Sequence, residues 1–152
     1  MNEQFKQVSE AFSRKAAVYD AFGENHINLT RMRRKVYDHI GRWAAAGGRL
    51  LELNAGTGLD AVALIERGYT VHATDIAPDM VAAAREKIGR FGLQKQLPVQ
   101  QCSFTELQEV DAGPFDGIYS NSGGLNCVAD LTLVTRHLPR LLKQNGTVTW
   151  VI

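Results

Sequence analysis

The sequence has few cysteines, no long apolar run and almost no net charge, and each absence narrows what the chain can be. Its two cysteines, Cys102 and Cys127, form no CxxC pair and no metal-ligand spacing, and a reduced, intracellular protein accounts for them. No stretch approaches the roughly 18 apolar residues of a membrane span. The start of the chain, Asn2 to Gln7, carries charge and glutamine with no apolar run behind it, so we expect no signal peptide. We therefore expect a cytoplasmic protein.

Charge of either sign is not in excess. Seventeen basic residues face sixteen acidic ones, a formal charge of +1, so no overall field attracts nucleic acid or an anionic membrane, and any such binding would have to be local. We interpret the basic run at Arg31, Arg33, Arg34 and Lys35 as a solvated helix face. The histidines show no ligand spacing such as HExxH. We expect no bound metal and neither nucleic acid nor membrane as a partner.

The length of 152 residues, 45% of them hydrophobic, suits one compact domain. Residues 1–46 predict an N-terminal helical cap, because apolar residues recur there at helical spacing. Five of them are expected to share one face: Leu29, Met32, Val36, Ile40 and Trp43. Gly47 and Gly48 are expected to end the helix. Residues 47–152 then predict the core of the domain.

Within the core, short β-type runs alternate with helical stretches. We expect strands at 49–53, 70–74, 97–101, 116–120 and 147–152, and helices at 59–67, 78–91 and 130–143. Strict alternation predicts an α/β fold, a three-layer α/β/α sandwich around a mainly parallel, doubly wound sheet of strand order 3-2-1-4-5. Because the sequence stops inside the fifth strand, we expect a chain truncated there, whose exposed edge supports self-association.

The segment LLELNAGTG, Leu50 to Gly58, predicts a strand that runs into a glycine turn and then a helix. Gly56, Gly58 and Ala61 satisfy the dinucleotide fingerprint, so NAD is one ligand that this turn could bind. Glu52 argues against it, because a carboxylate there repels a pyrophosphate and attracts a nucleoside bearing an ammonium and a sulfonium. A plain strand-to-helix connection is the remaining alternative.

Asp75 ends the run VHATD at the carboxyl end of the second predicted strand. A carboxylate there lies beside the crevice where such sheets bind ligands, and it can accept hydrogen bonds from both ribose hydroxyls. The alternative is a helix cap before Pro78. For His72, inside the same strand, we expect a packed core histidine.

The segments ELNAGTG, HATDIAPDMVAAAREK, FDGIYSNSGGLNCV and LPRLLKQNGTVTWVI, in this order, resemble the class I S-adenosylmethionine-dependent methyltransferases of Rossmann-like fold, small-molecule type. The resemblance covers about Arg49 to Ile152 and implies S-adenosyl-L-methionine as the cofactor. It implies that Ile76 and Met80 flank the adenine and that Asp75 binds the ribose. The other residues that it implies are Ser103 and Phe104 at the adenine edge, and Glu52, Asn54, Gly56, Gly58 and Asn121 near the methionine moiety.

The sequence departs from the family pattern at two positions. Asn54 stands where the first glycine is usual, and asparagine is the non-glycine residue that best tolerates left-handed backbone angles. Ser103 stands where an aspartate often accepts a hydrogen bond from the adenine amine, and a hydroxyl accepts it without charge assistance.

The N-terminal segment AFSRKAAVYD, Ala11 to Asp20, resembles the leading helix of methyltransferases from quinone and biotin pathways, which closes over the cofactor. By that resemblance Tyr19 caps the site, with Arg14 nearby. A helix that merely packs on the sheet is the alternative.

The function that the resemblance implies is methyl transfer to a small-molecule acceptor. Such a displacement needs alignment and exclusion of water more than a catalytic dyad, and we find no dyad. The sequence after the fourth strand, Asn121 to Gly124, reads NSGG and not an NPPY-like motif, which counts against adenine in nucleic acids and glutamine side chains as acceptors. The alternatives are a non-catalytic cofactor-binding or scaffolding module and an NAD-binding oxidoreductase.

Overall fold

A computed structural model describes residues 3–152, so Met1 and Asn2 of the expected cap lie outside the described residues. The N-terminal part is helical, as expected. It consists of α1 (Glu3–Ser13), α2 (Ala16–Glu24) and α3 (Ile27–Trp43). Division of the chain into a cap and a core remains an interpretation.

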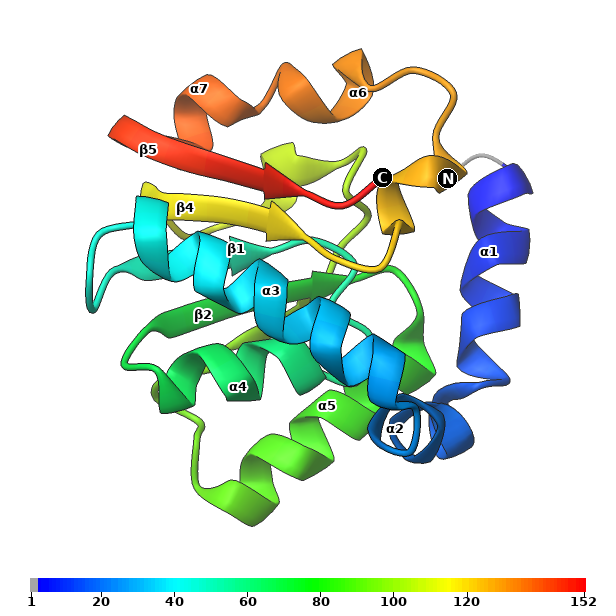
Figure 1. The fold of residues 1–152 in the computed structure, drawn as a ribbon. Helices are drawn as coiled ribbons and strands as arrows, with labels where there is room; N and C mark the ends of the chain where they lie inside the picture. The colour runs from blue at the N-terminus through cyan, green and yellow to red at the C-terminus, as the bar shows by residue number, and fades with distance from the viewer. Residues whose placement is uncertain (1–2) are drawn as a thin grey trace.

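A five-stranded sheet forms the centre of the molecule (Figure 1). Its strands are β1 (Arg49–Glu52), β2 (Thr70–Asp75), β3 (Val99–Gln101), β4 (Phe115–Ser120) and β5 (Leu142–Trp150). Every pairing is parallel and the order is β3-β2-β1-β4-β5, which confirms the predicted topology. Because the order reverses between β1 and β4, a crevice opens at the carboxyl ends of these two strands.

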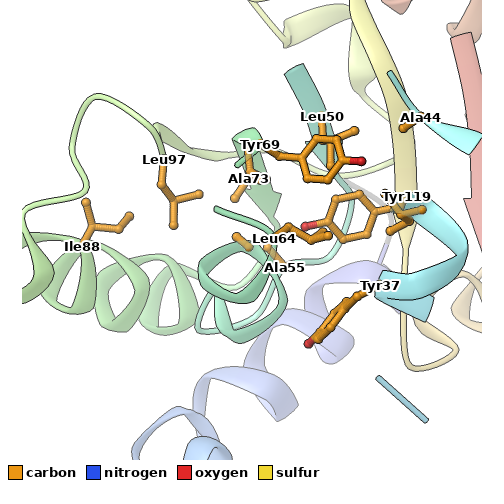
Figure 2. Packing of buried hydrophobic residues seen from close by; sticks show 13 residues of the cluster. Tyr37, Ala44, Leu50, Ala55, Leu64, Tyr69, Ala73, Ile88, Leu97 and Tyr119 are labelled. Carbon is orange, nitrogen blue, oxygen red and sulfur yellow. The ribbon is translucent and has the colours of Figure 1, made fainter. Parts of the chain in front are cut away.

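One side of the sheet packs against α3, α4 (Leu59–Glu66) and α5 (Pro78–Phe91) (Figure 1). Leu50 and Tyr119 point to this side, where they pack in a cluster with Tyr37 of α3 and Leu64 of α4. Figure 2 shows the rings of Tyr37, Tyr69 and Tyr119 among the aliphatic side chains of this cluster.

The other side of the sheet receives the neighbouring strand residues, because successive side chains in a strand alternate. Leu51 and Ile118 pack there with Phe5 of α1, Val134 of α6 (Thr132–Thr135) and Leu141 of α7 (Leu138–Leu141). Two short 3-10 helices, Leu107–Glu109 and Gly124–Cys127, complete this layer. The predicted three-layer sandwich is therefore confirmed.

The packing face predicted for α3 is wrong at two positions. Met32 and Trp43 are 55% and 61% exposed, whereas Tyr37, Ile40 and Ala44 are buried. The buried face is rotated by about one residue from the predicted face. It includes Tyr37, whose amphipathic side chain buries its ring although an aliphatic residue was expected to do so. The helix ends at Trp43, before Gly47, whose φ is +69°.

The helix predicted at 130–143 is wrong as a single element. It is divided into α6 and α7, and Leu142–Gln144 already belong to β5. Pro139 lies at the start of α7, where its missing N–H costs nothing, but its ring would clash with the carbonyl of Thr135 in a continuous helix. β5 is an edge strand, and Val148 on it is 39% exposed.

His72 behaves as the sequence predicts. Its ring is 7% exposed on β2, and Nε2 lies 3.1 Å from Oε1 of Gln100. Burial lowers the pKa of His72, and the Gln100 hydrogen bond offsets part of the effect.

Residues 3–152 contain neither a membrane-spanning helix nor a cluster of metal ligands. None of the helices described there combines the length and the apolar character needed to cross a membrane. In the same range, no group of three or more His, Cys, Asp or Glu side chains is arranged to hold a metal ion.

Candidate cofactor site

A cavity of about 70 Å³ lies at the carboxyl ends of β1, β2 and β4, beneath the N-terminal helices. This edge of an open parallel sheet is where such folds bind ligands. Among the predicted site residues, those that line the cavity are Tyr19, Asn54, Gly56, Asp75, Ile76, Phe104 and Asn121. The predicted residues Glu52, Gly58, Met80 and Ser103 do not line it.

The turn between β1 and α4 takes left-handed backbone angles at alternate residues. The φ values are +51° at Asn54, +57° at Gly56 and +78° at Gly58. Asn54 therefore adopts the conformation expected of the glycine that it replaces. Its Oδ1 accepts a 2.8 Å hydrogen bond from Ser120 Oγ, which joins the turn to the end of β4. A Cβ on Gly124 would lie 2.1 Å from Asn54 Nδ2, so this contact requires glycine at position 124.

Asp75 anchors the glycine turn from the end of β2. Its Oδ2 accepts a 2.7 Å hydrogen bond from the Gly56 N–H, and its Oδ1 accepts one of 2.8 Å from the Ala77 N–H. Burial raises the pKa of Asp75, and these backbone hydrogen bonds offset part of the rise. A carboxylate has about four lone-pair sites, so each oxygen retains capacity to accept a further donor from the cavity.

Glu52 lies behind the cavity wall, 1% exposed, at the end of β1. Its Oε2 has no hydrogen-bond partner among the described residues, and neither does the buried hydroxyl of the neighbouring Tyr119. Burial raises the pKa of Glu52 well above its ordinary value, and repulsion from Asp60 adds to this. An unpaired buried carboxylate oxygen is a strong acceptor for a cation or an N–H donor.

A polar network around Asp60 was missed by the sequence analysis. Asp60 is 7% exposed in the first turn of α4, and it accepts hydrogen bonds from the Tyr37 hydroxyl and, at 3.2 Å, from Asn121 Nδ2. Arg33 Nε lies 3.6 Å from its Oδ1. Arg33 was assigned to a solvated basic run, yet it turns inward and lines the cavity. The signal that the sequence offered was an acid two residues after the GTG turn.

Tyr19 of α2 covers the glycine turn. A Cβ on Gly56 would lie 3.5 Å from Tyr19 Cε1, so the ring contacts the bare backbone there. The next residue, Asp20, forms a 2.6 Å ion pair with Lys87 of α5 and accepts a hydrogen bond from the Thr57 hydroxyl. These two contacts hold α2 against α5 and against the glycine turn.

The first helix also reaches the cavity, which Val8 and Phe12 line. Phe5 holds α1 in place through an edge-to-face contact with Phe104, with ring centroids 5.8 Å apart. Arg14, expected near the site, does not line the cavity. It is exposed and pairs with Glu10 at 3.9 Å.

The side expected to hold the adenine is formed partly by other residues than predicted. Ile76 and Phe104 line the cavity, together with Cys102. Burial raises the pKa of the Cys102 thiol to about 12, with smaller contributions from Glu109 and Glu106.

Two predicted adenine neighbours, Ser103 and Met80, do not line the cavity. The Ser103 hydroxyl bonds to Thr105 Oγ1 at 2.8 Å and accepts from the Thr105 N–H at 3.2 Å, so two of its three hydrogen-bonding positions are used locally. Met80 is fully buried below the turn, its sulfur 3.9 Å from the position of a Cβ on Gly56.

The electrostatic environment of the cavity is acidic. Burial is the largest of the causes that raise the pKa of Tyr19. The positive charge of Arg33 lowers this pKa in part, and the acidic side chains of Asp60, Asp75 and Glu52 raise it further. Two acidic side chains, Asp60 and Asp75, line the cavity beside one guanidinium, that of Arg33, and the buried Glu52 lies behind the wall. Such a site favours a ligand with positive charge over a pyrophosphate.

The sequence of residues 50–146, well over half of the chain, matches the family described as methyltransferase domain. The chain belongs to this family. The methyltransferase domain is 34% identical over 105 residues to a ubiquinone biosynthesis O-methyltransferase of Xanthomonas axonopodis pv. citri, covering 69% of the chain and 43% of that protein. It is 36% identical over 145 residues to a phosphatidylethanolamine N-methyltransferase of Cereibacter sphaeroides, covering 95% and 66%.

Solved structures share the fold of this methyltransferase domain. A TehB-like S-adenosylmethionine-dependent methyltransferase of Corynebacterium glutamicum matches with a TM-score of 0.68 at 19% identity, covering 95% of the chain and 72% of that structure. The glycopeptide N-methyltransferase MtfA in complex with S-adenosylmethionine matches with a TM-score of 0.66 at 18% identity, covering 76% and 51%. The chain spans between about two fifths and two thirds of the length of the two curated relatives above. The family inferred from the sequence is thereby confirmed.

Proposed function

We propose that this chain binds S-adenosyl-L-methionine and forms the catalytic domain of an enzyme that methylates a small molecule. The observation that carries the proposal is the acidic cavity at the switch point of the sheet, with the unpaired oxygen of Glu52 behind it. A cofactor with a sulfonium and an ammonium complements this charge. Membership of the methyltransferase domain family supports the same conclusion.

The lining residues suit different parts of this cofactor. Asp75 would accept hydrogen bonds from the ribose hydroxyls while it holds the Gly56 N–H. Ile76 and Phe104 offer apolar surface to the adenine, and Asn121 and Asp60 lie where the methionine moiety would be held. When bound, the cofactor supplies an electrophilic methyl group on sulfur. The protein's task is then to orient the acceptor and exclude water.

The cavity must widen before this cofactor enters. Ligand pockets for molecules of this size span roughly 300 to 1,000 Å³, well above the 70 Å³ found here. The N-terminal helices contribute Tyr19 and Phe12 to the lining of the cavity. We propose that α2 moves aside on binding and that Tyr19 then covers the ligand.

The acceptor that fits best has an apolar body. Val8, Phe12 and Cys127 form an apolar wall on the side of the cavity that faces α1. The names of the two relatives point to different acceptor atoms, oxygen in one and nitrogen in the other, so they do not select one for this chain. The cytoplasmic location expected from the sequence stays a prediction.

Calorimetric titration of S-adenosylmethionine, S-adenosylhomocysteine and NAD into the chain tests the proposal. We expect binding of the first two and none of NAD. Binding of NAD alone would support the oxidoreductase alternative. Tight cofactor binding without methyl transfer to any apolar phenol or amine, in the full-length protein, would support the non-catalytic alternative. A related fold carries the name of a [4+2]-cyclase, SpnF, at a TM-score of 0.63, so fold alone does not decide the reaction.

A further inference from the structure

The outward face of α3 carries a stripe of basic side chains. Lys35 follows Arg31 by four residues and Arg42 follows it by eleven. This spacing places the three side chains on one line along the helix, about 16 Å long. Arg34 lies beside this line. All four side chains are exposed, whereas the opposite face of α3 is buried against the sheet (Figure 1).

The charges of this basic stripe (Arg31, Arg34, Lys35 and Arg42) are not neutralised within the part of the chain that the structure describes. No ion pair or hydrogen bond of their side chains is found there. The acid on the same exposed face, Asp38, is engaged by Arg67 at 2.8 Å. The stripe is therefore a local positive surface on a chain whose formal charge is only +1.

Large apolar side chains border the stripe. Met32 and Trp43, 55% and 61% exposed, are eleven residues apart and so share one border, where His39 contacts the Trp43 ring with centroids 6.4 Å apart. Ile27, 65% exposed, lies at the other border. Basic residues combined with exposed tryptophan and aliphatic side chains are typical of helices that lie in a membrane interface.

We propose that the outward face of α3 docks on an anionic lipid surface. The helix lies parallel to that surface, with the basic stripe against lipid phosphates and with Met32 and Trp43 in the headgroup region. The phosphates of a nucleic acid carry the same charge as those of a lipid surface. However, a nucleic acid offers no apolar layer for the exposed side chains of Met32, Trp43 and Ile27. The proposal is independent of the cofactor site, because none of these side chains lines the cavity. It also departs from the expectation of no membrane partner, which was based on net charge.

Co-sedimentation with vesicles tests the proposal. We expect the chain to bind vesicles of phosphatidylcholine mixed with phosphatidylglycerol and not to bind vesicles of phosphatidylcholine alone. We also expect it to dissociate from the anionic vesicles as the salt concentration rises. The triple variant Arg31→Gln, Lys35→Gln and Arg42→Gln should bind roughly 100-fold more weakly, because each basic side chain near an anionic bilayer contributes a factor of about five. Trp43→Ala should weaken binding while leaving its salt dependence unchanged.

A second triple variant, Lys6→Gln, Arg90→Gln and Lys95→Gln, is the matched control, because it removes the same charge from exposed positions outside α3. It should bind vesicles as the parent chain does. Circular dichroism confirms that each variant is folded. Equal losses in the two triple variants would overturn the proposal, and so would equal binding to neutral vesicles. Tighter binding to duplex DNA than to anionic vesicles would also overturn it and assign the stripe to nucleic acid.

Discussion

Replacement of Glu52 by glutamine should stabilise the protein while weakening its binding site. The carboxylate is 1% exposed, its Oε2 is unpartnered, and Asp60 repels it. A buried polar atom without a partner costs about 1 to 3 kcal/mol, and more when it is charged; the amide keeps the first cost and removes the excess that comes from the charge. Glutamine keeps the shape of the side chain and removes the charge. We therefore expect Glu52→Gln to raise the free energy of unfolding by about 1 to 3 kcal/mol near neutral pH.

The gain should depend on pH in a defined direction. Because burial raises the folded-state pKa of Glu52 above its unfolded value, the folded protein holds this proton more tightly than the unfolded chain. The penalty is therefore absent below the unfolded pKa and complete above the folded one. Glutamine does not ionise, so the variant has no such penalty. The difference in free energy of unfolding between the variant and the parent chain should therefore grow as the pH rises through that interval.

Urea denaturation at about pH 5 and about pH 8 measures this difference. Glu66→Gln is the matched control, because Glu66 is exposed and its loss should change stability little at either pH. A Glu52→Gln variant that is less stable than the parent at the higher pH, or whose gain is the same at both, would refute the reasoning. Under the proposed function, the same variant should bind S-adenosylmethionine more weakly.

Asp75→Ala should weaken S-adenosylmethionine binding by roughly 1.5 to 3 kcal/mol, and unchanged affinity in a folded variant would show that Asp75 only anchors the turn. Gly124→Ala should lower the melting temperature, because its Cβ would lie 2.1 Å from Asn54 Nδ2, while Gly89→Ala, with nothing within 4 Å of its Cβ, should stabilise helix α5 by roughly 0.4 to 1 kcal/mol. An equal effect of the two substitutions would contradict this packing. Light scattering should show self-association through the β5 edge, reduced by Val148→Lys; a monomeric parent chain would dismiss that expectation.

The sheet could be predicted from the sequence because its signals are local. The runs at β1, β2 and β4 are short, apolar and bounded by glycine or proline, and the helices between them fix the parallel order. The helix expected at 130–143 failed because Pro139 was not given its weight as a breaker. The face of α3 failed because burial of Tyr37 depends on Asp60, a partner 23 residues away in the sequence.

The site was predictable where the backbone itself carries the signal. Asn54 and Gly56 were found from the turn, and Asp75 from its place at the end of a strand. Arg33 was missed because charge patterning on one helix does not tell which member of a basic run turns inward. Ser103 does not line the cavity, and a local hydrogen bond to Thr105 engages its hydroxyl, which a sequence pattern does not reveal.

The two parts of the site are held by different kinds of contact, and this division suits a ligand that must enter and leave. The glycine turn is fixed from below by backbone hydrogen bonds to Asp75 and by core packing, so its geometry persists without a ligand. The α2 cover is held mainly by one polar clamp, in which Asp20 contacts Lys87 and Thr57. Lys87 in this pair is 14% exposed and Asp20 is 34% exposed, so water reaches the pair from the Asp20 side and can replace it when α2 moves. The cover is therefore the segment that opens at least cost, while the surface that recognises the ligand stays in place.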